Sequence, residues 1–274
     1  GIEKFSKIIL PVLFVLVIII AVYSMSLPGA MAGVSYLFKP DFSKLTPETF
    51  AYAMGQSFYS LSVGMGAIIT YGSYVRKDEN IMASSAWTGI SDLMFALLAG
   101  LAIMPAVFAA GIEPGSGPGL IFQSVPYIFA AMGSGMPLLS AVVSTFFFLA
   151  VVVAAMTSCI SLIEVGVAWM MERFKLSRAA ACKWIFLVCG TLGVLCSLSF
   201  GPLKDMIIAG RTLFDLFDWV SSNIMLLLMG LLVVIFVGHV MKKDDVRDEI
   251  TNSGTLRGNS RLFGIFYFLV RWVC

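Results

Sequence analysis

An apolar segment at residues 49–74 constrains this chain more than any other feature, because it could cross a bilayer yet is interrupted at its centre. Ser60, Ser62, Gly64 and Gly66 lie close together there, and each glycine costs a helix interior about 1 kcal/mol relative to alanine. Open backbone at that depth is tolerated only where it lines a cavity or is buried in protein, and a broken helix is typical of transporter binding sites. The alternative is one kinked helix whose small residues let a neighbour approach.

The composition indicates a membrane protein. Charged residues make up 12% of the chain and hydrophobic residues 59%, with a mean hydropathy of +0.95, whereas a soluble domain has about 25% charged residues. We therefore expect an all-α polytopic membrane protein that forms a single transmembrane domain over residues 1–274. Its environment is the lipid bilayer, and nothing in the composition indicates a nucleic-acid partner.

The apolar runs predict spans and loops along the chain. We expect spans at residues 8–25, 49–74 (broken near 63–66), 81–110, 136–171, 179–200, 213–241 and, in part, 262–274. Residues 26–49 are expected to form a polar loop and residues 242–260 a polar linker. The apolar run at residues 120–131 is too short to cross and is expected to dip back over the protein surface.

The distribution of basic residues predicts the orientation. Most Lys and Arg residues fall in one set of loops, and the opposite set holds Lys39, Lys44, Lys204 and Arg211. Because cytoplasmic loops carry the excess of basic residues, we expect the first residues of the chain on the cytoplasmic side of the plasma membrane.

Polar groups inside the spans are the candidates for function, because they are costly in lipid. They form three clusters: Ser60 and Ser62 with the backbone at Gly64, the pair Ser91 and Asp92, and Thr157 and Ser158 with Ala154. Hydroxyl and carbonyl oxygens can replace the hydration shell of a monovalent cation. The hydroxyls of Thr157 and Ser158 could instead bond carbonyls of their own helix.

Acidic residues at the span ends have two interpretations each. Asp218, close to Asp215, could form an external gate or could favour a helix N-terminus through its dipole. Glu172 and Tyr74 could form an internal gate with basic partners or could be solvated at the surface.

Three stretches carry a resemblance to a known family. Gly55-Gln56, Ser62-Val-Gly-Met-Gly-Ala-Ile-Ile-Thr-Tyr71 and Ser73-Tyr-Val-Arg-Lys-Asp78 resemble the sixth helix of the bacterial neurotransmitter:sodium symporter family, which has the LeuT fold. Shorter matches, Phe5–Pro11, Ala154–Ser158 and Lys175–Arg178, follow the family's order. The resemblance implies two inverted five-helix repeats, of which this chain would span helices five to ten and the start of helix eleven. Without helices one to four, the chain is expected to hold half of a site and not to transport alone.

The resemblance also implies roles for individual residues. The first sodium site would use Ser60, Ser91 and Asp92, and the second would use the Ala154 carbonyl with Thr157 and Ser158. The substrate pocket would be lined by Tyr59, Ser60, Ser62, Gly64, Met65, Ser158 and Leu162. Asp218 is similar to the family's outer-gate acid and Glu172 to its inner-gate acid.

Two positions refine the expected substrate and ions. Met65 stands where some relatives carry Phe, and its flexible side chain favours a pocket for large apolar or aromatic amino acids. Phe95 stands where chloride-dependent relatives would carry a serine, while Asp92 supplies a fixed charge, so we expect chloride independence. Sodium is the expected coupling ion, with no organic cofactor and no transition metal.

The expected function is sodium-coupled symport of a neutral amino acid by alternating access. A channel or a receptor on the same fold and a non-transporting fragment remain alternatives. An intramembrane enzyme is disfavoured, because the sequence shows no nucleophile–base pair. The particular amino acid, the sodium stoichiometry and the oligomeric state do not follow from the sequence.

Overall fold

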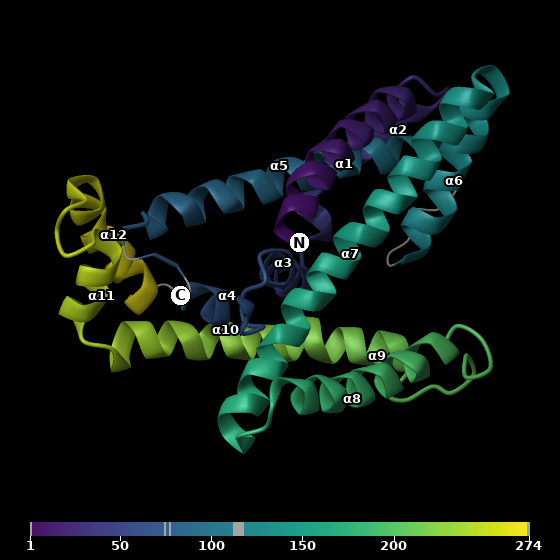
Figure 1. Ribbon diagram of the computed structural model, residues 1–274. Helices are drawn as coiled ribbons and strands as arrows, with labels where there is room; N and C mark the ends of the chain where they lie inside the picture. The colour runs from purple at the N-terminus through teal and green to yellow at the C-terminus, as the bar shows by residue number, and fades with distance from the viewer. Residues whose placement is uncertain (1, 74, 77, 112–117, 273–274) are drawn as a thin grey trace. The chain divides into compact units, whose positions relative to one another are not determined.

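A computed structural model describes residues 2–73, 75–76, 78–111 and 118–272, and every regular element in these ranges is helical (Figure 1). The helices are α1 (Ile2–Met25), α2 (Ala30–Phe38), η1 (Phe42–Lys44), α3 (Pro47–Ser60), α4 (Ala67–Gly72), α5 (Ile81–Ala109), α6 (Pro118–Gly135), α7 (Pro137–Phe174), α8 (Arg178–Leu198), α9 (Leu213–Val220), η2 (Ser221–Met225), α10 (Leu226–Ile235), η3 (Phe236–Val240), α11 (Lys243–Thr251) and α12 (Arg257–Trp272).

Within the expected transmembrane domain, the chain forms two compact units. The first unit contains residues 1–45 and 90–160, and the second contains residues 46–89 and 161–274. The boundaries fall inside α5 and α7, so both long helices contribute residues to each unit.

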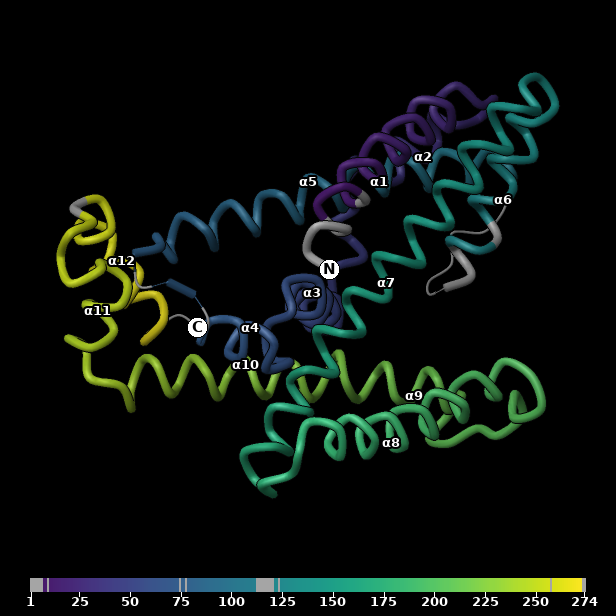
Figure 2. Tube along the Cα trace, viewed as in Figure 1, coloured from purple at the N-terminus to yellow at the C-terminus, as the bar shows by residue number. Residues whose placement is uncertain are grey.

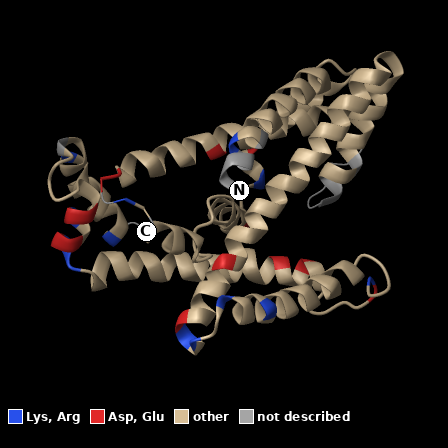
Figure 3. Ribbon diagram, viewed as in Figure 1, with Lys and Arg blue, Asp and Glu red and all other residues tan. Residues whose placement is uncertain are grey.

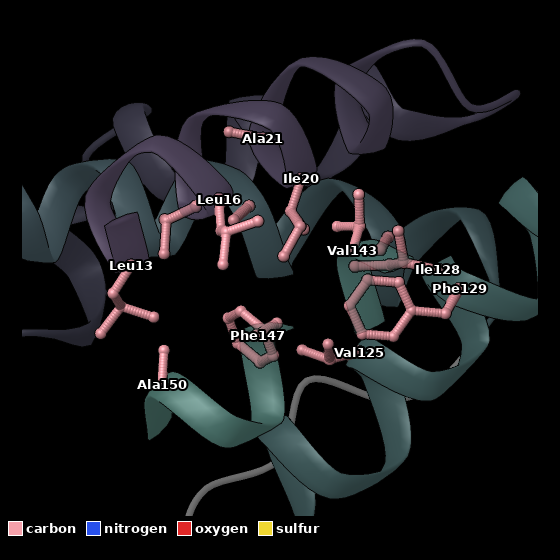
Figure 4. Packing of buried hydrophobic residues seen from close by; sticks show 13 residues of the cluster. Leu13, Leu16, Ile20, Ala21, Val125, Ile128, Phe129, Val143, Phe147 and Ala150 are labelled. Carbon is pink, nitrogen blue, oxygen red and sulfur yellow. The ribbon is translucent and has the colours of Figure 1, made fainter. Parts of the chain in front are cut away.

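The first unit has an apolar core between α1, α5, α6 and α7. Ile20 of α1 and Ile128 of α6 are 1% and 0% exposed, and both belong to this core (Figure 4). Phe129 packs edge-on against Phe147 and Phe148, with ring centroids 5.9 and 6.0 Å apart. Edge-to-face packing of this kind adds about 0.5–1.5 kcal/mol to the burial of each ring pair.

The expected loop at residues 26–49 contains regular structure. The chain bends by 116° between α1 and α2, and Gly29 at the bend has φ +83°. Gly33 then lies against the backbone of α5 at Met104 and Pro105, which leaves no room for a side chain. The prediction of an irregular loop is wrong here, because a close glycine contact stabilises a helix of only nine residues.

In the second unit, α3 packs against the helical run Leu213–Val240. A Cβ added to Gly55 would lie 2.7 Å from the Ser222 carbonyl oxygen, and one added to Gly230 would overlap the Phe58 ring. The run contains two π-helical turns, η2 and η3, which the expected uniform span at residues 213–241 did not include. Turns of this type widen a helix locally and are frequent at functional sites.

The expected polar linker at residues 242–260 is also partly helical. It contains α11, and α12 begins at Arg257, five residues before the expected span. Val246, Ile250, Phe263 and Tyr267 form a small buried cluster between these two helices. The prediction of a linker without regular structure is wrong for α11. Its apolar residues are few, but they share one face, and burial of that face against α12 stabilises the helix.

Several helices are suited to a membrane. Among the described residues, α5, α7, α8 and the run Leu213–Val240 are each long and apolar enough to cross a bilayer, and the bent pair of α1 and α2 would make a fifth span. Figure 3 shows charged residues gathered toward the ends of these helices, with long uncharged stretches between them. Helix α6, at Pro118–Gly135, extends beyond the expected short run and contributes Val125, Ile128 and Phe129 to the core.

Candidate functional site

The helix break lies between Ser60 and Ala67, where the trace leaves α3 and turns into α4 (Figure 2). Helix α3 ends in a pair of capping bonds: the Ser62 amide donates to the Tyr59 carbonyl at 3.1 Å, and the Val63 amide donates to the Phe58 carbonyl at 2.8 Å. Ser62 has φ +55° between them. This is the Schellman arrangement, which normally places glycine at the left-handed position.

Two glycines complete the break. Gly64 and Gly66 have φ +81° and +79°, and a Cβ at Gly64 would lie 3.0 Å from the Leu226 carbonyl oxygen. L-amino acids other than glycine rarely adopt this conformation. The segment flanking Met65 is therefore irregular backbone that α10 approaches closely, as the prediction of a broken helix requires.

The candidate pocket residues on α3 and the break lie together in the second unit. Tyr59 is 54% exposed, Ser60 is exposed, and Ser62, Gly64 and Met65 are half-buried. Leu162, 43% exposed, belongs to the same unit on α7. The irregular backbone of the break is half-buried, which is the shelter that open main chain needs inside a membrane.

The oxygens of the second candidate sodium set converge in the first unit. The Thr157 hydroxyl donates to the Ala154 carbonyl oxygen at 2.7 Å, and the Ser158 hydroxyl donates to the same oxygen at 3.2 Å. The back-bonding alternative is thus realised, and it brings three oxygens together. These are the hard oxygen donors that a sodium ion could use.

The first candidate sodium set is divided between the units. Ser60 belongs to the second unit, and Ser91 and Asp92 of α5 belong to the first. Asp92 is half-buried, and Phe95, 37% exposed, is one turn further along α5. The assignment of these residues to one ion stays a prediction.

The acidic residues of α9 have separate environments. Asp215 accepts a hydrogen bond from the Thr212 hydroxyl at 2.6 Å, and its amide donates to the same hydroxyl, so it belongs to the N-terminal cap of α9. Asp218 is exposed one turn later and accepts a hydrogen bond from the Ser222 hydroxyl at 3.4 Å. Asp218 is therefore accessible to a basic partner.

At the other end of the spans, the structure shows an ion pair that the sequence reasoning missed. Arg178 donates two hydrogen bonds to Glu164, at 3.0 and 2.7 Å, and the Glu164 side chain is 25% exposed. Glu172 is exposed at the end of α7, and Tyr74 lies outside the described residues. The signal for Glu164 was present, because an acidic residue within an apolar helix demands a partner.

These features define a class of protein. A polytopic helical protein with an irregular break between two helices, half-buried backbone at that break and grouped hydroxyl oxygens has the architecture of a secondary transporter.

Comparison with known proteins places the chain within that class. The model of the sodium:neurotransmitter symporter family matches residues 1–272. An uncharacterized sodium-dependent transporter of Haemophilus influenzae is 37% identical over 92% of this chain and 54% of its own length. The uncharacterized sodium-dependent transporter YhdH of Bacillus subtilis is 37% identical over 98% of this chain and 58% of its own length.

A solved structure is similar as well. The crystal structure of MhsT in complex with L-phenylalanine matches with a TM-score of 0.86 and 38% identity, covering 98% of this chain and 62% of that chain. The chain therefore belongs to the sodium:neurotransmitter symporter family and has the LeuT fold. It spans a little over half the length of the curated relatives it matches.

Membership settles two further predictions. The chain is a multi-pass membrane protein of a family of sodium-coupled transporters, and members of this family are not enzymes. The predictions of fold, family and non-enzymatic class are confirmed at this level.

Proposed function

We propose that this protein couples the downhill entry of sodium to the uptake of a neutral amino acid across the plasma membrane. The observation that carries the proposal is the break at Ser62, Gly64 and Gly66, whose positive φ values open the main chain at midspan. Open carbonyls and amides there can meet an ion and a zwitterion without a covalent step.

Sodium has two proposed sites. One uses Ala154, Thr157 and Ser158, whose hydroxyl oxygens lie 2.7 and 3.2 Å from the Ala154 carbonyl oxygen. The other uses Ser60 with Ser91 and Asp92. Binding of sodium would replace hydroxyl back-bonds by ion–oxygen contacts and would order the pocket before substrate arrives.

The proposed substrate is a large apolar or aromatic amino acid. Met65 is half-buried at the break and adapts its shape, Tyr59 and Leu162 are exposed apolar side chains, and MhsT is similar and is known in complex with L-phenylalanine. Ser62 and the adjacent backbone, with Ser158, would bind the polar end of the substrate.

The proposed cycle is alternating access. Asp218 would close the outer side and Glu172, with Tyr74, the inner side, each by pairing with a basic residue. The cytoplasmic orientation of the first residues follows from the excess of basic residues in one set of loops.

Uptake by proteoliposomes tests the proposal. The full protein, as expressed in its native host, is reconstituted into proteoliposomes. Uptake of labelled L-phenylalanine or L-leucine is then measured under an inward sodium gradient. Saturable uptake that stops when potassium replaces sodium is expected. Non-saturable flux would indicate a channel, and sodium-dependent binding without uptake would indicate a receptor; either result would contradict the proposal.

Chloride independence is a separate prediction. The Asp92 carboxylate supplies the negative charge that chloride would otherwise provide beside sodium, and Phe95 leaves no hydroxyl at the expected chloride position. Uptake should be unchanged when gluconate replaces chloride, and Asp92→Asn should make the residual uptake respond to chloride. Strict chloride dependence of the unsubstituted protein would refute the prediction.

A further inference from the structure

The inner half of the broken helix is held against α7 by two contacts within the second unit. At the start of α4, a Cβ added to Gly66 would lie 2.9 Å from Cγ1 of Val165. Near its end, the Tyr71 hydroxyl donates a hydrogen bond to the Ser161 hydroxyl oxygen at 3.0 Å. Helix α4 thus meets α7 at its N-cap residue and again near its end.

Helix α4 needs such contacts. It contains six residues, and helices shorter than about 12 residues are marginal by themselves. Tyr71 is 46% exposed, so burial of its ring contributes only part of the stabilisation. The order of α4 therefore depends on the few groups that join it to α7.

Ser161 connects this contact to the second proposed sodium site. Ser161 and Val165 are four residues apart and share one face of α7. Ser158 precedes Ser161 by three residues in the same helix. A helical serine can donate its proton to the carbonyl four residues earlier, here Thr157, and still accept a bond from Tyr71.

We propose that the hydroxyls of Tyr71 and Ser161 form a latch that couples the order of α4 to sodium bound at Ala154, Thr157 and Ser158. Both are positioning residues, because neither is assigned a contact with sodium or substrate. Sodium fixes the turn of α7 before Ser161, and the latch transmits that order to α4. Loss of sodium loosens the latch and frees α4 to move. This inference rests on the proposed function, since it uses the second proposed sodium site.

Hydrogen–deuterium exchange of the purified protein in nanodiscs, in sodium and in potassium, tests the latch. Tyr71→Phe removes the donor, Ser161→Ala removes the acceptor, and Ser161→Thr restores a hydroxyl. Two matched controls are Tyr52→Phe in α3 and Thr191→Ala in α8. The Thr191 hydroxyl donates to the Leu187 carbonyl of its own helix.

In the unsubstituted protein, sodium should slow amide exchange over residues 67–73. Tyr71→Phe and Ser161→Ala should each raise that exchange about 3- to 20-fold, the range for one interhelical hydrogen bond in a membrane protein. The double variant should be no faster than either single variant, because both remove the same bond. Ser161→Thr should restore the slow exchange, and the controls should leave it unchanged.

Two results would overturn the latch. One is unchanged exchange over residues 67–73 in both variants, and the other is a rise spread equally over α8 and α12, which would indicate general destabilisation. Because exchange does not require uptake, sodium-dependent protection that persists without transport would support the latch while the proposed function fails.

Discussion

At the scale of single residues, the Ala154 carbonyl oxygen accepts two hydroxyl hydrogen bonds and is also a proposed sodium ligand. In lipid, the Thr157 and Ser158 hydroxyls need an acceptor, and both find it one turn back at distances of 2.7 and 3.2 Å. The same convergence assembles three oxygens that can replace the water shell of a cation. In the proposed sodium site, ordinary helical back-bonds would thus bring the ligands together without any strained backbone.

This convergence leads to a prediction for sodium affinity. Thr157→Val and Ser158→Ala each remove one oxygen at nearly constant volume, and each should raise the sodium concentration for half-maximal substrate binding by about tenfold, equivalent to about 1.4 kcal/mol. Thr191→Val in α8, whose hydroxyl bonds Leu187 of its own helix, is the control. Sodium titrations of labelled substrate binding measure the effect, and unchanged affinity in both variants would remove this site from the account.

At this scale the sequence was informative where residue type dictates conformation. Gly64 and Gly66 indicated the break, and both have positive φ. Ser62 also has positive φ, which its residue type did not predict, because serine enters that region only when surrounding bonds impose it. The pairing of Glu164 could not be predicted locally, because its partner, Arg178, is fourteen residues away in the next helix.

At the scale of elements, α3 and the run Leu213–Val240 approach each other closely at glycines. Gly55 and Gly64 each face a carbonyl oxygen of that run, and Gly230 faces the ring of Phe58. In a membrane the hydrophobic effect does not drive helices together, because lipid tails are as apolar as the side chains. Helices associate instead where small residues let their backbones pack closely. The π-helical turn η2 lies where Gly55 makes its contact with Ser222.

Gly230→Ala should test this contact. The added methyl group would overlap the Phe58 ring, and we expect a loss of about 1–3 kcal/mol in the free energy of unfolding. Gly193→Ala in α8, where a Cβ would meet nothing within 4 Å, should be neutral or stabilise by up to about 1 kcal/mol. Thermal unfolding in detergent compares them, and equal effects of the two substitutions would show that the close contact does not matter.

The long apolar elements could be predicted from the sequence, and the short helices could not. Helix α7 was expected at residues 136–171 and spans Pro137–Phe174. Helices α2 and α11 have nine residues each, and they depend on tertiary contacts that local composition does not reveal. The π-helical turns carry no sequence signature that the apolar pattern could show.

At the scale of the molecule, distant segments of the second unit are joined by one buried amide. The Asn259 side chain of α12, 8% exposed, donates to Asn80 Oδ1 and to the Ile250 carbonyl oxygen, both at 2.8 Å. Asn80 in turn accepts a bond from the Ala83 amide and so caps α5. The start of α5 is thereby tied to the pair α11–α12.

Asn259→Ala should destabilise this junction. It leaves the Ile250 carbonyl without its side-chain donor and removes one of the two bonds to Asn80 Oδ1, which costs about 1–3 kcal/mol. Asn252→Gly is the control: Asn252 is half-buried, its bond to the Glu79 carbonyl is 3.3 Å long, and glycine tolerates its φ of +47°. Amide exchange at residues 81–84 should rise only in Asn259→Ala, and an equal rise in Asn252→Gly would contradict the assignment.

The most direct test of the central claim is an experimental density map of the protein prepared in sodium with L-phenylalanine. We expect the helix to be interrupted at residues 61–66, with density for the amino acid against Ser62 and Met65 and for an ion among Ala154, Thr157 and Ser158. One continuous helix through residues 47–72, with Ser60 and Ser62 turned toward lipid, would contradict the account.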